Sequence, residues 1–172
     1  MRKFYFGGGF PPLDKNHPED SMKGDFRAQI LGDVKKLLYP PINKDMEIME
    51  ILLTDKSSYV GPYFFYGESL QAQKTVLVEN EMIHKCTDAV FLLENISNPG
   101  TVTELVNAAL LGKNVHVFYI SLDSGTPETE INSDQWYPIA FAQMTAKNIE
   151  CMECCDLEDA HMKILSFVES IK

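Results

Sequence analysis

Short apolar runs alternate with amphipathic stretches along most of this chain. Apolar runs of four to seven residues, bounded by turn residues, are typical of buried strands. Longer stretches in which apolar residues recur every three or four positions are typical of helices that pack on one side. The pattern predicts strands at residues 3–6, 48–53, 88–93, 115–120 and 148–152. It predicts helices at residues 26–38, 70–86, 102–110, 138–146 and 156–171.

The order of these elements determines the fold class. Strands that alternate with helices are joined by crossovers, which make the strands parallel and place helices on both faces of the sheet. The sequence therefore predicts an α/β protein with a doubly wound, mostly parallel five-stranded sheet of the Rossmann/flavodoxin-like type. One domain accommodates such a sheet, and we expect residues 1–172 to form it. The polar stretches at 14–25 and 121–132, and the aromatic-rich stretch at 55–67, are expected to be loops.

One βαβ unit, at residues 89–120, contains the candidate catalytic residue. Pro99 and Gly100 form the turn after its first strand, and Glu104 follows in the first turn of the helix. This is the carboxyl edge of the sheet, where open α/β folds bind ligands. The spacing Thr101-x-x-Glu104 is also that of a capping box, in which the glutamate bonds back to the helix start. Both interpretations stay open, because the helix dipole favours an ionised carboxylate in either role.

Two further segments are expected at the same edge. Gly7, Gly8 and Gly9 follow the first strand, where they either let a ligand approach the backbone closely or form a flexible turn. Residues 59–66 are rich in aromatic rings, which either pack on the core or line a pocket for a flat ring. We expect ligands to gather where residues 7–10, 59–65 and 98–104 meet.

Charge and the amino-terminal sequence argue against several classes of function. A formal net charge of −10 without a Lys or Arg cluster argues against binding to DNA, RNA or an anionic membrane surface. Residues 4–6 are too short an apolar run for a signal peptide, and no run is long enough to span a membrane. We expect a cytoplasmic location, and the charge is compatible with a small neutral ligand.

The four cysteines raise the question of a metal site. Three of them lie in Cys151-x-x-Cys154-Cys155. Structural zinc normally takes two separated pairs of ligands, and the chain has no second pair and no His-x-x-x-His. Reduced thiols are the expectation for a cytoplasmic protein. We predict neither a metal nor a cofactor.

Several short motifs follow one another over the first two thirds of the chain. They are Tyr5-x-x-Gly8 after the first strand, Gly-Pro-Tyr-Phe-Phe at 61–65, Asp88 at the start of the third strand, Gly100-Thr101-x-x-Glu104 and Gly112-Lys113. In this order they resemble the nucleoside 2-deoxyribosyltransferase family, which includes the related 2′-deoxynucleoside 5′-monophosphate N-glycosidases.

The resemblance implies a mechanism and assigns residues to it. Glu104 corresponds to the family's nucleophile, which attacks C1′ of a deoxyribosyl group and forms a covalent glycosyl-enzyme that a second nucleobase, or water, resolves with retention. Tyr5 corresponds to the tyrosine that orients this nucleophile, and Gly8 to the glycine that leaves room for the ligand. The implied partners are a nucleoside and a nucleobase, in a homo-oligomer whose neighbouring subunit often completes the site. Candidates for that contribution are Asn132, Asp134, Trp136 and Lys172.

Two positions depart from the family's pattern. The family commonly carries Asp six residues before the nucleophile, to hold the sugar, and this chain has Asn98 there. It also commonly carries Asp eight residues before the strand-opening Asp88, to bind and protonate the leaving base, and this chain has Asn80. An amide cannot deliver that proton. Glu79 and Glu81 flank Asn80 but point elsewhere on a helix, unless its register is offset by one.

Three functions therefore stay open. The first is deoxyribosyl transfer between nucleobases. The second is hydrolysis of nucleosides or their 5′-monophosphates at the same site, where the scarcity of basic residues near the motifs slightly favours an unphosphorylated substrate. The third is a non-catalytic nucleotide-binding module, which the two Asn residues would fit. The predicted catalytic residues are Glu104 and Tyr5, and the predicted substrate-binding residues are Gly8, Phe10, Tyr63, Phe64, Asn80, Asn98, Gly100 and Thr101.

Overall fold

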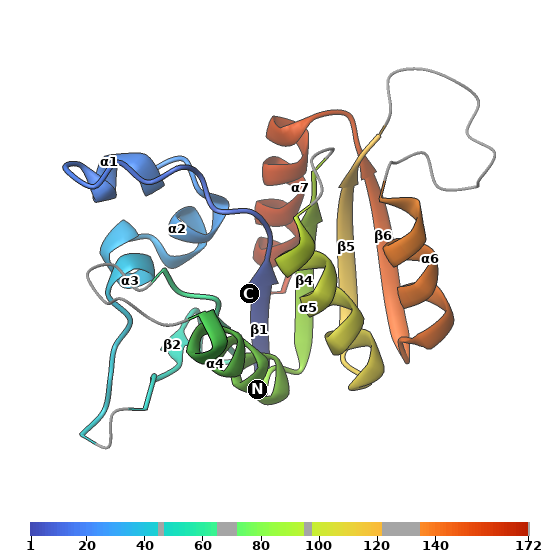
Figure 1. Ribbon diagram of the computed structural model, residues 1–172, viewed down its shortest axis with the longest axis horizontal. Helices are drawn as coiled ribbons and strands as arrows, with labels where there is room; N and C mark the ends of the chain where they lie inside the picture. Colours follow the sequence, from blue (N-terminus) through green and yellow to red (C-terminus); the bar gives the residue numbers. More distant parts are fainter. Residues whose placement is uncertain (45–46, 65–71, 95–97, 122–134, 172) are drawn as a thin grey trace.

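A six-stranded sheet forms the centre of the molecule, in the order β2-β3-β1-β4-β5-β6 (Figure 1). The computed structural model describes residues 1–44, 47–64, 72–94, 98–121 and 135–171. β2 is antiparallel to β3, and the other neighbouring pairs are parallel. The doubly wound, mostly parallel α/β fold is confirmed. The strands are β1 (Arg2–Gly7), β2 (Ile51–Leu52), β3 (Ser57–Gly61), β4 (Asp88–Leu93), β5 (Asn114–Ile120) and β6 (Asn148–Cys154).

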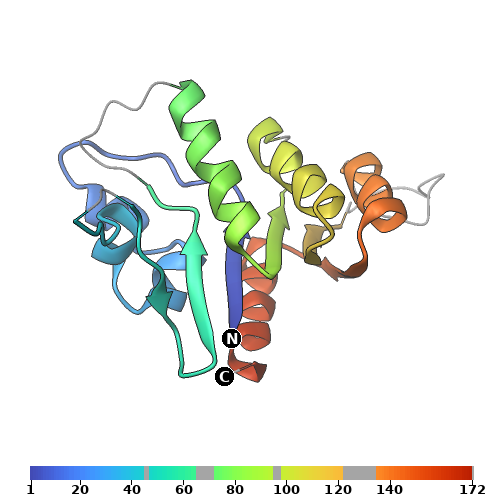
Figure 2. The same cartoon turned by 90° about the horizontal axis from the view of Figure 1, so that it is seen from below.

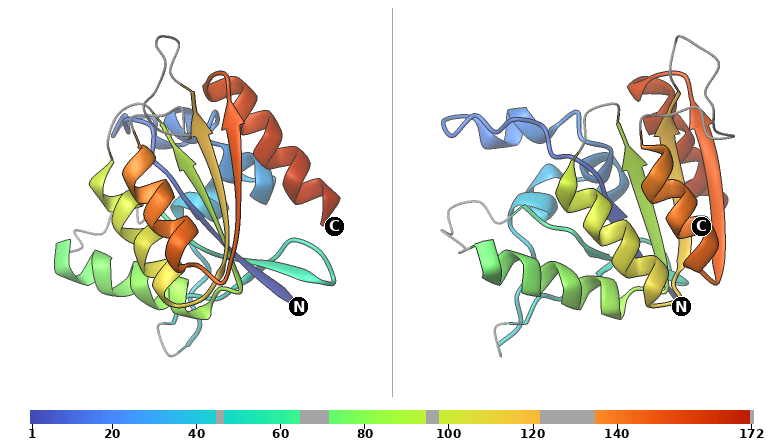
Figure 3. Two further views of the ribbon diagram at one scale, coloured as in Figure 1. Left: turned by 90° about the vertical axis from the view of Figure 1, so that its right-hand side faces the viewer. Right: turned by 45° about the vertical axis from the view of Figure 1, so that its right-hand side comes forward.

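Helices cover both faces of this sheet. Helices α4, α5 and α6 lie side by side on one face, and α7 lies on the other, where it contacts α2 (Figures 2 and 3). Each long helix buries part of its apolar residues against the core, which explains why helical periodicity was visible in the sequence, whereas others, such as Val76 and Leu77 on α4, are exposed. The helices are α1 (Pro18–Met22), α2 (Phe26–Leu31), α3 (Val34–Leu38), α4 (Ala72–Lys85), α5 (Pro99–Leu110), α6 (Trp136–Thr145) and α7 (Leu157–Ser170).

The strand count differs from the prediction because β3 lies inside residues 55–67, a stretch whose composition predicts a loop. Its two serines make the stretch look polar, but the whole strand is buried. Ser58 donates a hydrogen bond to Glu50 (3.0 Å), and the hydroxyls of Ser57 and Thr54 bond to each other (2.7 Å). The predicted strand at 48–53 is correspondingly short, since only Ile51–Leu52 pairs with β3.

Two helix predictions also need correction. The stretch at 14–25 contains the short helix α1. The helix predicted at 26–38 is broken into α2 and α3, because Gly32 ends the first in a left-handed conformation (φ 66°) and Asp33 caps the second. The helices α4, α5, α6 and α7 are confirmed with shifted ends. The start predicted for α4 at residue 70 and the excursion predicted at 121–132 fall, except for residue 121, outside the described residues.

The strand order defines where a ligand site is expected. After β1 the chain continues to β3, and after β4 it continues to β5, which lies on the opposite side of the β1–β4 pair. Such a reversal leaves a crevice above the carboxyl ends of the two central strands. Gly7–Gly9 and the start of α5 both lie at this edge.

Alternation along β1 distributes its side chains between the two faces. Phe4 packs on Phe167 of α7 and Phe6 packs on Phe26 of α2. Tyr5 points to the opposite face, which α4 and α5 cover. The strand thus delivers Tyr5, and Gly7 two residues later, to the underside of α5.

No helix in the described ranges combines the length and the apolar composition that a bilayer span requires. The predicted location in the cytoplasm stays a prediction.

Candidate active site

Helix α5 starts earlier than the sequence predicted, and this changes what Glu104 does. Its N-cap is Asn98, whose Oδ1 accepts hydrogen bonds from the amides of Gly100 (3.1 Å) and Thr101 (3.4 Å). Thr101 is a buried residue inside the helix. Glu104 lies in the second turn, beyond the amides that need a cap. The capping-box interpretation of Thr101-x-x-Glu104 is therefore wrong, and the carboxylate is available for another role.

The Glu104 carboxylate lies beside the end of β1. A β-carbon placed on Gly7 would lie 3.0 Å from Glu104 Oε2 and 2.5 Å from the ring of Phe91, so glycine provides the space that the carboxylate occupies. Tyr5 is completely buried on the same side of β1. Its hydroxyl is near enough to the Glu104 carboxylate to lower the pKa of Glu104, although the two groups do not meet in full hydrogen-bonding geometry. Burial and then the nearby Glu104 raise the pKa of Tyr5 well above its ordinary value, so the phenol keeps its proton and presents it to the carboxylate.

A second glutamate, Glu79, affects the pKa of Glu104. Burial, followed by the negative charge of Glu79 on α4, raises the pKa of Glu104 from 4.5 to about 7, while Tyr5 and Arg27 oppose that rise. Burial also raises the pKa of Glu79. Two neighbouring carboxyl groups whose pKa values are displaced towards neutrality are typical of acid–base and nucleophilic sites.

A fully buried arginine fixes the glycine segment that follows β1. Arg27 forms a two-pronged ion pair with Asp25 (2.8 and 2.6 Å). Its other donors reach the carbonyls of Gly8 (3.0 Å) and Gly9 (2.8 Å), with a longer bond to that of Phe6 (3.5 Å). A buried charge without such partners would be strongly unfavourable, so this network holds the Gly8–Gly9 backbone in one conformation.

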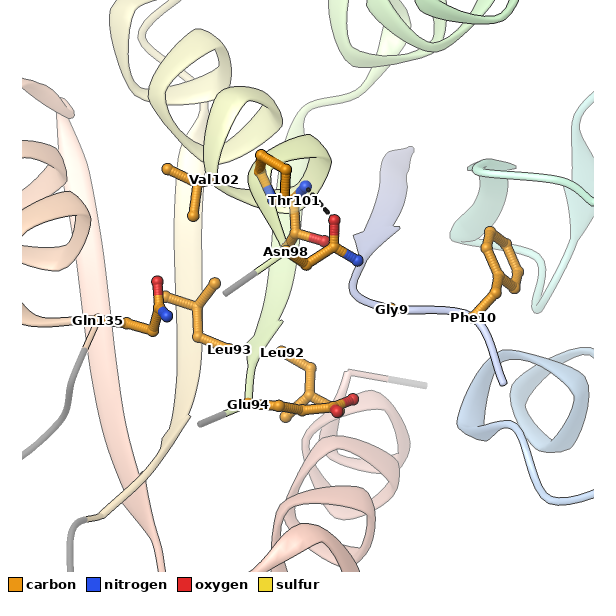
Figure 4. Close-up of a pocket in the computed structure, with 10 residues that line it drawn as sticks. Gly9, Phe10, Leu92, Leu93, Glu94, Asn98, Thr101, Val102 and Gln135 are labelled. Carbon is orange, nitrogen blue, oxygen red and sulfur yellow. Dashed lines mark hydrogen bonds between the residues drawn. The ribbon is translucent and has the colours of Figure 1, made fainter. Parts of the chain in front are cut away.

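A cavity of about 280 Å³ opens above the carboxyl end of β4 (Figure 4). Gly9 and Phe10 line it on one side, and Asn98, Thr101 and the start of α5 line it on another. Glu104 and Tyr5 do not line this cavity; they lie beside it, at the Gly7 end of the same glycine segment. A second cavity, of about 390 Å³, lies on the α7 side and shares Gly9 and Phe10 with the first.

The fold is similar to that of a CMP N-glycosidase, BcmB, from Clostridium botulinum. The similarity covers 96% of this chain and 99% of that chain, with a TM-score of 0.53 and 10% sequence identity. A solved SsGBP mutation variant is similar over 99% of this chain and 56% of that chain, with a TM-score of 0.46 and 11% identity. The sequence matches no family model and no curated protein. At this identity the likeness to BcmB shows a shared fold, and activity has to be argued from the site.

The aromatic residues predicted to bind substrate separate into two groups. Phe10 lies at the cavity, with the Arg27 guanidinium 3.7 Å from its ring centre, and it packs edge-to-face on Phe64 (5.4 Å). Tyr63 is buried, packs on Tyr59 (5.2 Å) and donates a long hydrogen bond to the Met49 carbonyl (3.4 Å). This placement favours the core alternative for Tyr63. Residues 65–67 of the aromatic segment lie outside the described residues.

Two neighbouring residues of α4, Glu79 and Asn80, have different surroundings. Asn80 Oδ1 accepts a hydrogen bond from Asn107 Nδ2 (2.9 Å) and so joins α4 to α5. Glu79 is the residue whose charge acts on Glu104 and Tyr5. This influence favours the alternative in which the register of α4 is offset by one position, and a role for Glu79 at the site stays a prediction. A role for Asn80 in substrate binding stays a prediction.

The remaining predicted residues lie along the carboxyl edge. Gly8 has a φ of 155°, where a side chain would be strained, and its carbonyl is held by Arg27. Gly100 is exposed at the start of α5. Trp136 is exposed at the start of α6. The other candidates for a neighbour's contribution, Asn132, Asp134 and Lys172, lie outside the described residues.

Sequence reasoning missed the Asp25–Arg27 pair. Arg27 stands next to Phe26 at the start of a helical pattern, where a charged residue is expected to be exposed to solvent. Its burial is explained only by the carbonyls of Phe6, Gly8 and Gly9, which the fold brings next to it. Glu94, which lines both cavities, was missed because it follows an apolar strand as an ordinary polar turn residue.

The structure offers no metal site in the ranges it describes, where no cluster of three or more His, Cys, Asp or Glu has a suitable arrangement. All four cysteines are unpaired. Cys151 and Cys155 are exposed, and Cys86 and Cys154 are buried.

Gly7 provides a direct test of the crowded end of β1. Gly7→Ala should lower the free energy of unfolding by about 1–3 kcal/mol, because the added methyl group meets the Phe91 ring at 2.5 Å and Glu104 at 3.0 Å. Gly24→Ala is the matched control, since a β-carbon there meets nothing within 4 Å. Urea unfolding measures both variants. Equal midpoints for Gly7→Ala and wild type would show that the packing around Glu104 is looser than described.

Proposed function

We propose that residues 1–172 form a nucleoside 2-deoxyribosyltransferase-like domain that cleaves the N-glycosidic bond of 2′-deoxynucleosides. The observation that carries this proposal is the placement of Glu104. Its carboxylate is not used as a helix cap, and it lies against Gly7 and Tyr5 at the edge where a doubly wound sheet binds ligands. The shared fold with a protein described as a CMP N-glycosidase supports the same class of reaction.

The chemistry follows a double displacement. A Glu104 oxygen attacks C1′, the C1′–N bond breaks, and its electron pair leaves with the base nitrogen. Glu79, the second carboxyl group at the site, gives that nitrogen its proton and thereby takes the part that an Asp at position 80 would have had. Tyr5 donates towards the Glu104 carboxylate and orients it. An acceptor nitrogen or water then attacks C1′, releases Glu104 and returns a proton to Glu79.

The transfer of the sugar to another nucleobase is our first choice for the second step. Hydrolysis is the second choice, and the description of BcmB as an N-glycosidase favours it. A non-catalytic nucleotide-binding module is the third choice, and our assignment of Glu79 as the acid that Asn80 lacks argues against it.

A single incubation separates these functions. Wild-type protein is mixed with 2′-deoxyadenosine and free cytosine, and the products are separated by chromatography. Deoxycytidine together with adenine is the expected result and identifies a transferase. Adenine without deoxycytidine, in this and in incubations with other acceptor bases, identifies a hydrolase. If no base is released from any deoxynucleoside or its monophosphate, the proposed function is wrong.

Glu79→Gln should change both the rate and its pH dependence. The loss of the acid should slow base release by about 100-fold or more. Wild type should be active with Glu104 ionised and Glu79 protonated, so its base release should pass through a maximum as the pH rises and should fall once Glu79 also loses its proton. Because the charge of Glu79 helps to raise the pKa of Glu104, the variant should reach its plateau at lower pH.

Glu81→Gln is the control for this variant. It makes the same substitution two positions further along α4, at an exposed residue that pairs with Lys85. Its pH–rate profile should coincide with that of wild type. An unchanged profile in Glu79→Gln would remove Glu79 from the mechanism.

A further inference from the structure

The cavity edge carries a polar pair that the proposed reaction does not use. A β-carbon placed on Gly9 would lie 3.4 Å from Asn98 Nδ2 and 3.7 Å from Glu94 Oε1. The Asn98 amide and the Glu94 carboxylate both point towards Gly9 (Figure 4). Asn98 Oδ1 is occupied by the helix amides, and its Nδ2 is left to donate. Glu94 makes no hydrogen bond or ion pair with any other described residue, and it borders both cavities.

The pair of Glu94 and Asn98 lies at a distance from Glu104 that one pentose could span. Glu104 contacts the Gly7 position, and Glu94 with Asn98 contacts the Gly9 position. Two residues of extended chain span at most about 7 Å. A pentose whose C1′ lies at Glu104 can therefore place its far end between the carboxylate and the amide.

Arg27, the buried cation beside the cavities, has no N–H donor left for a ligand. The guanidinium of arginine has five N–H donors. In Arg27 these five donors bond to Asp25 and to the carbonyls of Phe6, Gly8 and Gly9. Neither cavity has a Lys or Arg among its described lining residues. His161 lines the second cavity, and burial lowers its pKa, so it is neutral at pH 7.

Another source of phosphate binding is also occupied. The amides at the start of α5, an ordinary anion site, are already bonded to Asn98. A phosphate dianion in either cavity would thus meet the Glu94 carboxylate, with no Lys or Arg among the described residues that line the cavities.

We propose that Glu94, with Asn98, makes the site selective for an unphosphorylated nucleoside: together they bind a sugar hydroxyl at the end away from C1′, and Glu94 excludes a phosphate monoester there. This inference rests on the proposed function. The hydroxyl donates to the Glu94 carboxylate and accepts from Asn98 Nδ2, a pairing that a doubly charged phosphate cannot make with a carboxylate. Selectivity then comes from a repulsive group as well as an attractive one.

The test measures binding separately from turnover. Glu104→Gln protein, which should not turn substrate over, is titrated by calorimetry with 2′-deoxyadenosine and 2′-deoxycytidine and with their 5′-monophosphates. Each nucleoside should bind at least about tenfold more tightly than its monophosphate. Adding Glu94→Gln should reduce that ratio by about tenfold, because a neutral amide no longer repels phosphate. Adding Glu169→Gln, an exposed residue near the end of α7, should leave the ratio unchanged.

Each outcome separates this inference from the proposed function. Monophosphates that bind as tightly as nucleosides, or a ratio that Glu94→Gln leaves unchanged, overturn the role of Glu94. If wild type releases base from monophosphates alone, cleavage of the N-glycosidic bond stands, and both the nucleoside substrate and the selectivity are overturned. If nucleosides bind selectively but no base is ever released, the selectivity stands and the reaction is overturned.

Discussion

Glu104→Gln is expected to reduce base release by about 1,000-fold or more. An amide oxygen is a poor nucleophile and carries no charge to stabilise an oxocarbenium-like transition state, so both contributions of the carboxylate are lost together. The substitution keeps the size of the side chain, which lies against Gly7. Initial rates of base release from 2′-deoxyadenosine measure the effect. A variant with more than a tenth of the wild-type rate would show that Glu104 is not the nucleophile.

The same variant should be more stable than wild type above neutral pH. Folding raises the pKa of Glu104 from 4.5 to about 7, so its contribution to stability is fully present below pH 4.5 and is lost as the pH rises through about 7. That displacement corresponds to about 3 kcal/mol. Urea unfolding at pH 5 and pH 8 checks the sign. The expected gain at pH 8 also shows that any loss of activity does not come from unfolding.

Arg27→Met is expected to have the largest effect on stability, a loss of about 3–5 kcal/mol. The variant leaves Asp25 buried without its counter-ion, and it leaves the carbonyls of Gly8 and Gly9 without their donors. Each unsatisfied buried group costs free energy in addition to the lost pair. The wall that the glycine segment forms beside the cavity should also loosen, and base release should fall. The urea midpoint measures the first effect and initial rates measure the second.

Two controls make this result specific. The double variant Asp25→Asn/Arg27→Met should recover part of the stability, because it no longer buries an unpaired charge. Lys23→Met removes an exposed lysine that pairs with Asp20 on the neighbouring helix and should leave the midpoint unchanged. If Arg27→Met unfolds at the urea concentration of wild type, the buried network does not hold the glycine segment.

Most of the fold could be predicted because its strong elements are strongly periodic. The runs that became β1, β4 and β5 are apolar on both faces, and α7 shows one apolar side over its whole length. β3 could not be predicted, since its serines are buried only because Glu50 and Thr54 satisfy their hydroxyls. The break at Gly32 was missed for another reason: the apolar positions keep their helical spacing across it.

The candidate site was predictable in part. The resemblance of the β1 and α5 motifs to a known family proposed Glu104, Tyr5 and Gly8, and the structure places Tyr5 and Glu104 on the same side of β1. The start of α5 could not be predicted, because Asn98 and Thr101 are both good caps and only the geometry selects Asn98. Which of Glu79 and Asn80 faces Glu104 depends on the rotation of α4 against α5. Sequence spacing fixes the two residues on one helix but not that rotation.

The most direct test of the account is detection of the covalent intermediate. Wild-type protein is mixed with 2′-deoxyadenosine, quenched in acid and digested, and the peptide that contains Glu104 is examined by mass spectrometry. We predict that this peptide carries one deoxyribosyl group in wild type and none in Glu104→Gln. Adenine release by wild type and Glu104→Gln at equal rates, with no sugar on this peptide, would contradict the central claim.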